Sequence, residues 1–416
     1  MKKFTIVKLL LCLILISFLS VDYASGENEG NSITWDKTFG NRLEDMGFSI
    51  IQTKNGGYAI AGCTILDREE IKDTWKAKLG YIEFTKDKRQ DIWIIKLDKN
   101  GNIEWDEVFG ENRPDIAHSI IQTRDGGYAV AGFIWTIYVD KQNIWIMKLG
   151  ENGNKEWDKT FDKDENDIAY SIIQTKDGGY VFAASTGLKI RGEANCWVIK
   201  LGSKGNMEWE NNFGGIGLQE IYSIVQTKDE GFIAVGGIWS KGAGKGDAYL
   251  VKLNKRGDLV WDRTFGGSEN DEAHSIIQTE DGGYVVTGFT VSEDIGDKDF
   301  WVIKLDKDNN KVWDKSFGGT SEDWANSIIQ TTDGGYMVAG CTKSMGTGKT
   351  DIWIAKLDVR GNIVWDRTFG GSENDEAHSI IQTEDGGYAV AGWTKSKGTG
   401  SSDVWVLKLD ENGNLR

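Results

Sequence analysis

The sequence predicts an all-β protein, a seven-bladed β-propeller with four antiparallel strands in each blade. The chain has 416 residues, with 53 Gly but one Pro, and 39% of its residues are apolar and 11% aromatic. This composition favours a folded chain of short strands and tight turns over a disordered or collagen-like chain. One unit also recurs seven times, beginning near residues 35, 105, 157, 209, 261, 313 and 365. A repeat period near 50 residues is typical of propellers.

The first 26 residues have the features of a secretory signal. Two Lys follow Met1, an uncharged apolar run spans Leu9 to Leu19, and Ala24-Ser25-Gly26 offers small residues for cleavage. We expect cleavage after Gly26, with an uncleaved N-terminal anchor as the alternative, because the apolar run is shorter than the ~20 residues of a membrane span. The mature chain, residues 27–416, is then secreted or associated with the cell surface. We find no other segment in it that could cross a bilayer.

Each repeat contains four segments that predict strands, and the sixth repeat shows the pattern. Its strands are expected at 327–331, 336–340, 351–358 and 363–369, separated by Gly, Asp and Asn turn residues. Turns of hairpin length join the first strand to the second and the third to the fourth, whereas the other two links are longer. All longer links therefore gather at one end of the blades, called the loop face below. A β-solenoid or a row of separate modules is the alternative architecture.

The two ends of the mature chain predict how the ring closes. The chain begins with a fourth-strand segment at 33–39 and ends with a third-strand segment at 403–409. We expect the N-terminal strand to pair as the outer strand of the last blade, which removes free sheet edges. The first repeat also carries an insertion at 65–90, between its second and third strands, that is charged and contains Trp75.

Several polar residues recur in every repeat and are expected to keep each blade folded. Ser49, Gln52, Thr53 and Lys96 have identical equivalents in all copies, and a carboxylate such as Asp36 follows the first Trp of each unit. We expect the Lys and this carboxylate to form a repeated polar contact between strands.

Three cysteines remain after signal cleavage. Cys63, Cys196 and Cys341 stand where other repeats hold apolar residues. We therefore expect small buried thiols and not a disulfide or a metal cluster.

The repeat units follow a sequence pattern that is known from other proteins. The pattern is an apolar strand ending in Gly-Gly or Ala-Gly, as at Gly236-Gly237 and Ala391-Gly392, then a variable loop, an Asp-x-Trp strand and a Trp after a Gly-containing turn. This order of segments resembles kelch-type repeats. Units such as Trp-Asp-x-Thr-Phe-Gly-Gly and Ser-Ile-Ile-Gln-Thr-x-Asp-Gly-Gly-Tyr are similar to those of secreted bacterial and archaeal propeller proteins. The resemblance covers residues 31–416, whereas WD-type repeats are shorter and carry a Gly-His pair absent here. It implies the fold and no particular activity.

The loop face is the expected binding surface, because loops carried on a rigid scaffold commonly hold binding residues. Thirteen of the 18 Trp are repeated framework residues, and the other five map to this face together with all three His. The candidate ligand-binding residues are Trp75, Trp135, Trp239, Trp324, Trp393, His118, His274 and His378. Exposed Trp rings can stack on sugar rings or grip a peptide, with packing between blades as the alternative role.

The three His share one repeat position with Phe48, Tyr170, Tyr222 and Asn326, three residues after an Asp in six of the seven repeats. A ring of imidazoles and carboxylates at a channel mouth could hold a metal ion or a cationic group. However, the His come from the second, fifth and seventh repeats, a spacing unlike that of zinc sites, and the Asp is better explained as a cap of the turn before the first strand. We therefore expect no metal site and no cofactor, with calcium as the ion to test.

Composition and motifs also narrow the function. The 64 Asp and Glu outnumber the 48 Lys and Arg, and the resulting net charge of -16 argues against nucleic acid or an anionic membrane as partner. Neither a Gly-x-Ser-x-Gly elbow nor a phosphate loop occurs in the sequence. We expect an exported, monomeric, non-catalytic binding or scaffold propeller that recognises a polysaccharide or a protein through the loop face. The alternative is a carbohydrate-active enzyme, a glycoside hydrolase or lyase, that uses loop-face carboxylates.

Overall fold

The computed structural model describes residues 33–66, 89–110, 114–136, 141–164, 166–188, 193–214, 217–291 and 297–415. The expected signal segment, Trp75 and most of the 65–90 insertion lie outside the described residues. Among the described residues, no helix is long and apolar enough to pass through a membrane.

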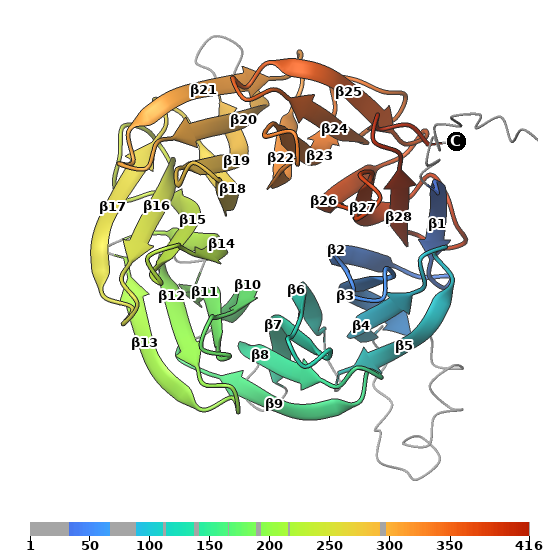
Figure 1. The fold of residues 1–416 in the computed structure, drawn as a ribbon, viewed down its shortest axis with the longest axis horizontal. Helices are drawn as coiled ribbons and strands as arrows, with labels where there is room; N and C mark the ends of the chain where they lie inside the picture. Colours follow the sequence, from blue (N-terminus) through green and yellow to red (C-terminus); the bar gives the residue numbers. More distant parts are fainter. Residues whose placement is uncertain are drawn as a thin grey trace, which may run out of the picture. The chain divides into compact units, whose positions relative to one another are not determined.

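The described residues form 28 strands in seven four-stranded antiparallel sheets, which surround a central axis (Figure 1). The predicted seven-bladed β-propeller is confirmed, and the solenoid and separate-module alternatives are wrong. Each blade takes its first three strands from one repeat unit and its outer strand from the start of the next unit around the ring, and its first strand lies nearest the axis (Figure 1).

The strand bounds follow the repeats. Blade 1 contains β2 (Asp45–Gln52), β3 (Tyr58–Leu66), β4 (Arg89–Leu97) and β5 (Ile103–Phe109). Blade 2 contains β6 (Ile116–Gln122), β7 (Tyr128–Thr136), β8 (Lys141–Leu149) and β9 (Lys155–Phe161). Blade 3 contains β10 (Asp167–Gln174), β11 (Tyr180–Leu188), β12 (Glu193–Leu201) and β13 (Met207–Phe213). Blade 4 contains β14 (Gln219–Gln226), β15 (Phe232–Ile238), β16 (Asp247–Leu253) and β17 (Leu259–Phe265).

The remaining blades continue the pattern. Blade 5 contains β18 (Glu272–Gln278), β19 (Tyr284–Val291), β20 (Lys298–Leu305) and β21 (Lys311–Phe317). Blade 6 contains β22 (Asp323–Gln330), β23 (Tyr336–Thr342), β24 (Asp351–Leu357) and β25 (Ile363–Phe369). Blade 7 contains β26 (Asp375–Gln382), β27 (Tyr388–Thr394), β28 (Asp403–Leu409) and, as its outer strand, β1 (Trp35–Phe39).

The ring closes as the sequence predicts, because β1 completes the last blade. It pairs antiparallel with β28 over five residues, from Trp35 opposite Lys408 to Phe39 opposite Val404. Figure 1 shows the blue β1 beside the dark red β28. The Trp35 ring also meets the Tyr58 ring of blade 1 edge-on, with centroids 5.6 Å apart. The N-terminal strand therefore completes the sheet of blade 7 and also contacts blade 1.

The hydrophobic core lies between neighbouring blades. In one cluster, Ala59 and Ile94 of blade 1 pack with Val130 and Met147 of blade 2, and all four side chains are buried. The second and third strands are apolar on both faces because each face meets a different blade. A single blade would leave both faces in water, which is why the repeats need a closed ring.

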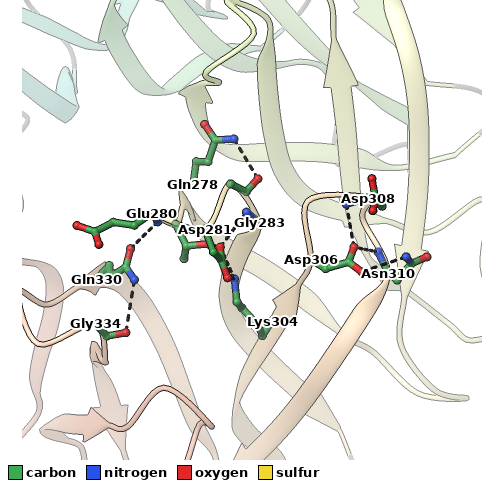
Figure 2. Close-up of polar contacts among 12 residues, drawn as sticks. Gln278, Glu280, Asp281, Gly283, Lys304, Asp306, Asp308, Asn310, Gln330 and Gly334 are labelled. Atoms are coloured by element: carbon green, nitrogen blue, oxygen red, sulfur yellow. Dashed lines mark hydrogen bonds and ion pairs between the residues drawn. The ribbon is translucent and has the colours of Figure 1, made fainter.

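Framework hydrogen bonds join the first strands around the ring. At the junction of blades 5 and 6, the Gln330 Oε1 atom accepts the Glu280 backbone N–H at 3.0 Å, and its amide nitrogen donates to the Gly334 carbonyl (Figure 2). The equivalent glutamine accepts the equivalent backbone N–H at all seven junctions, including Gln52 with Glu384 across the closure. The sequence predicted only that this glutamine keeps its blade folded, and the structure shows that it also joins neighbouring blades.

The expected contact between the repeated Lys and the carboxylate after the framework Trp is wrong. The buried Lys304 ammonium donates instead to Asp281 in the turn between the first two strands, at 3.0 Å (Figure 2). Lys304 lies opposite Trp313, so the next residue, Asp314, projects from the other face of the sheet. Asp314 accepts the indole N–H of Trp301 at 3.4 Å. Burial opposes ionisation of Asp281, but hydrogen bonds from Thr279 and Lys304 outweigh it and lower the pKa of Asp281 to about 2.

Cys63, Cys196 and Cys341 are free and buried, as expected. Burial raises the pKa of the Cys63 thiol to about 12. A neutral, inaccessible thiol is a poor nucleophile, so these residues act as small core side chains.

Candidate functional site

Each first strand contains a β-bulge at the same repeat position. In β2, for example, the pairing with β3 shifts register between Gly47 and Ser49, so Phe48 has no partner in the ladder. A bulge re-aims the side chain of the extra residue. The residues at the seven bulges all line one cavity of about 340 Å³. They are Phe48, His118, Tyr170, Tyr222, His274, Asn326 and His378, and are called the axial belt below.

The axial belt lies at the loop-face end of the ring. Every bulge is close to the start of its first strand, directly after the longer link that enters the blade. The strands β2, β6, β10, β14, β18, β22 and β26 that carry the belt surround the axis in Figure 1. The cavity is therefore lined by all seven blades and opens widely to the surface that the sequence marks for binding.

Aromatic contacts link most of the belt. Phe48 meets His378 at 5.0 Å and His118 at 5.4 Å between ring centroids. The chain of contacts continues from His118 to Tyr170 at 5.1 Å and from Tyr170 to Tyr222 at 5.2 Å. Tilted and edge-on rings at these separations attract one another, so the belt is a preformed aromatic wall.

Hydrogen bonds complete the belt in blades 5 and 6. The His274 Nδ1 atom lies 2.9 Å from the Ala325 carbonyl oxygen and must carry the proton, because a carbonyl can only accept. The Asn326 amide donates to the Ala377 carbonyl at 2.8 Å. Each side chain is thus held by the next blade in the ring.

Three glutamates stand beside the belt on one side. Glu220, Glu272 and Glu376 occupy the position two residues before the belt in blades 4, 5 and 7, and are called the acidic arc below. Glu272 lines the cavity, and its Oε2 lies 3.4 Å from the His274 Nε2. The Tyr222 hydroxyl donates to Glu220 at 2.5 Å. The same position holds Met46, Ile116 and Ile168 in blades 1 to 3 and Trp324 in blade 6. The side of the mouth formed by blades 1 to 3 is therefore apolar, and the acidic side formed by blades 4 to 7 is interrupted by Trp324.

Burial alters the titration of two side chains at this mouth. Desolvation raises the pKa of Glu376 to about 7, against the opposing charges of Lys343 and Lys395. Desolvation also lowers the pKa of His378 to about 4, with a further contribution from His274. At neutral pH, His378 is therefore uncharged, and Glu376 is close to half ionised.

The Nε2 atom of His378 is buried and has no hydrogen-bond partner among the described residues. The Glu376 Oε2 atom lies 3.8 Å from it, which is beyond hydrogen-bond distance. A buried polar atom without a partner is costly, which makes this nitrogen a natural contact for a ligand.

The candidate Trp residues surround the belt at different depths. Trp135, Trp239 and Trp324 are half-buried, and the Lys343 ammonium lies 5.5 Å from the Trp324 ring. A side chain added at Gly237 would meet both Trp239 and Glu272, at 2.8 and 3.2 Å, so these two side chains are neighbours. Trp393 is only 7% exposed and packs beneath the surface. In the described residues none of these four Trp lines the axial cavity, and Trp75 lies outside the described part of the chain.

The repeated Asp before the belt caps the turn that enters the blade, as expected. In blade 7 the buried Asp375 accepts the backbone N–H of Gly371 at 2.9 Å and the hydroxyls of Thr394 and Ser396. Within the ranges that the structure describes, no three His, Cys, Asp or Glu side chains gather closely enough to share a metal ion. The expectations about calcium and cofactors stay predictions.

Comparisons with known proteins agree on architecture. No family model matches the chain. The regulatory protein FlaEY of Caulobacter vibrioides is 25% identical over 163 residues, which cover 33% of this chain and 17% of FlaEY. The chain therefore aligns with less than a fifth of that curated relative's length.

Solved propellers match nearly the whole chain at low identity. Sqt1 from Chaetomium thermophilum superposes with a TM-score of 0.50 at 10% identity, covering 91% of this chain and 100% of Sqt1. The Pan2 WD40 domain of Neurospora crassa gives 0.50 at 9% identity, covering 88% and 97%. Puromycin hydrolase gives 0.52 at 11% identity, covering 90% of this chain and 53% of that one. Such likenesses support the propeller fold alone, and the kelch-type resemblance stays a prediction.

Sequence reasoning named the belt position but missed the acidic arc. The available signal was that three of the seven repeats place Glu two residues before the belt, where others place Met, Ile or Trp. Only the closed ring gathers these glutamates around one mouth, because they come from three different blades.

Proposed function

We propose that this protein is an exported, non-catalytic binding propeller that receives its ligand in the axial cavity at the loop face. The observation that carries the proposal is the contrast between framework and belt. The framework Ser, Gln, Thr and Lys positions keep one residue in all seven repeats, whereas the belt position holds Phe, His, Tyr or Asn. A position needed only to fold each blade has no reason to differ among blades, whereas an asymmetric ligand needs different partners around the ring.

The chemistry of the cavity favours a polysaccharide. Tyr170, Tyr222, Asn326 and the imidazoles offer hydrogen-bond donors and acceptors, and the rings offer flat apolar faces. A sugar ring needs both, since its hydroxyls must be paired and its C–H faces covered. Half-buried Trp324 and Trp239 near the same mouth would extend such a surface. A protein ligand is the second candidate, because aromatic residues are also enriched at protein interfaces.

We propose an extracytoplasmic location and a monomeric state on the grounds given by the sequence. The signal-like N-terminus supports export. The buried thiols support it as well, because neutral, inaccessible cysteines tolerate an oxidising compartment. Closure of the ring by β1 leaves each blade's inner strands paired, so folding requires no second copy.

A glycan array with the purified mature protein, with and without calcium, tests the proposal. We expect binding that is lost when Tyr170 or His118 is changed to Ala and weakened in Trp324→Ala. Glu373→Gln is the matched control, because Glu373 lies in a loop of the same face and pairs with Lys349. Binding that survives both belt changes would reject the axial cavity as the site. A blank array followed by binding to a protein would transfer the proposal to a protein ligand.

One observation favours the enzymatic alternative. Glycosidases need a carboxylic acid whose pKa is raised towards neutrality, and burial raises the pKa of Glu376 to about 7 beside the cavity. Bound glycans should therefore be recovered and examined for cleavage. Products that disappear in Glu376→Gln would establish a glycoside hydrolase or lyase, whereas intact glycans would support binding without turnover.

A further inference from the structure

We propose that the axial cavity selects a sugar residue that carries a free, protonated amine. This inference rests on the proposed glycan-binding function and narrows it to one class of glycan. The acidic arc, the aromatic belt and the unpartnered His378 nitrogen support it.

The acidic arc supplies charge and acceptors for an ammonium group. Glu272 lines the cavity, with Glu376 beside the belt in blade 7 and Glu220 hydrogen-bonded to the belt Tyr222. An ammonium has three N–H donors and no acceptor, so it is satisfied by carboxylates and not by amide donors. Hydrogen bonds between charged partners are about twice as strong as neutral ones.

Two lysines near the mouth, Lys343 and Lys395, lie outside the axial cavity. Lys343 pairs with Glu322 at 2.5 Å and lies over the Trp324 ring, and Lys395 lies 5.5 Å from the Trp393 ring. Neither lysine lines the axial cavity in the described residues. The charge that faces a cavity ligand is therefore negative.

The belt adds contacts that suit a cation on a sugar ring. The faces of Phe48, Tyr170 and Tyr222 attract a cation and also cover apolar C–H surface. His378 is neutral at pH 7, so its buried Nε2 can pair with an ammonium or a hydroxyl without charge repulsion. An acetylated amine would lose its charge and bring an apolar methyl group and a carbonyl acceptor towards Glu272.

The test compares two trisaccharides that differ only in their amines. Isothermal titration calorimetry at pH 7 would measure the binding of a glucosamine trisaccharide with free amines and of its fully N-acetylated counterpart. We expect the free-amine form to bind at least about tenfold more tightly, the size of one charge-assisted hydrogen bond. Glu272→Gln should remove most of this preference while its melting temperature stays close to that of the wild type, and the loop-face control Glu373→Gln should retain it.

The outcomes separate this inference from the function on which it rests. Equal binding of the two trisaccharides, or binding of other array glycans with neither trisaccharide bound, would overturn the amine preference and leave glycan binding intact. Butylammonium that binds as tightly as the free-amine trisaccharide would overturn the sugar part, since the amine alone would then suffice. Absence of any glycan binding would overturn the proposed function and this inference together.

Discussion

Replacement of Glu376 by Gln should stabilise the protein at alkaline pH. The substitution keeps the size of the side chain and removes its ability to ionise. Burial raises the folded-state pKa of Glu376 from 4.5 to about 7, so the folded protein disfavours the charged form that the unfolded chain accepts. The associated stability is fully present below the unfolded pKa, near 4.5, and is lost as the pH rises through about 7.

The expected size of the effect follows from the same pKa difference. At about 1.36 kcal/mol per pKa unit, ionisation of Glu376 costs the folded state up to about 3 kcal/mol above pH 7. The side chain is only 22% exposed, so solvent screening removes little of this value. Glu376→Gln should therefore exceed the wild type in stability by about 2–3 kcal/mol at pH 8 and match it closely at pH 4.5.

Urea unfolding followed by tryptophan fluorescence at the two pH values measures the difference. Glu272→Gln is the matched control, because residues 261–284 and 365–388 are identical in sequence. A stability difference between Glu376→Gln and the wild type that is the same at pH 4.5 and pH 8 would refute the reasoning. An equal pH-dependent gain in Glu272→Gln would show that the local sequence, and not the surroundings of Glu376, is responsible.

Three further changes test the closure, the belt and the framework. Deletion of residues 33–39 should lower the melting temperature by roughly 5–10 °C, since losing one large aromatic contact costs about 3–5 kcal/mol; an unchanged melting curve would contradict the closure by β1. His378→Asn, which copies the Asn326 belt residue, should reduce the loss of stability on acidification from pH 6.5 to 4, because burial lowers the pKa of His378 to about 4 and the folded state resists its protonation. Unfolding midpoints of the variant and the wild type at pH 7.5 and 4.5 measure this loss. Equal acid sensitivity of the two proteins would reject the prediction. Gln330→Ala should cost about 1 kcal/mol in urea unfolding, because it leaves the Glu280 N–H without its partner in the neighbouring blade; no change would indicate that water replaces the glutamine.

The fold was predictable because every repeat carries the same pattern of strand and turn residues. The regularly placed turn residues predicted the four strands of each blade, and the fourth-strand character of 33–39 predicted its pairing with β28. Errors arose where a contact depends on which face a side chain occupies. The repeated Lys was assigned to the wrong carboxylate because Trp313 and Asp314 are adjacent in sequence and project from opposite faces.

The candidate site was harder to predict because its members meet only across the closed ring. Phe48 and His378 are neighbours at 5.0 Å, although 330 residues separate them in the chain. Their approach requires both the closure of the ring and a bulge in each first strand, and the β-bulge leaves no clear mark in the sequence. The acidic arc was missed because its glutamates come from three blades, and only the closed ring gathers them around one mouth.

The two identical segments show that blade order determines the chemistry of the mouth. His274 and His378 have the same sequence neighbours, yet His274 donates to the Ala325 carbonyl of blade 6, whereas His378 packs against Phe48 of blade 1 and leaves its Nε2 atom without a partner. The difference comes from the blade that follows each of them in the ring. A duplicated repeat can therefore acquire new chemistry at the axis without any change in its own residues, because half of its surroundings belong to the next blade. It follows that exchanging the order of repeats would alter the side-chain contacts at the axis more than it would alter stability, since the framework contacts are the same at every junction.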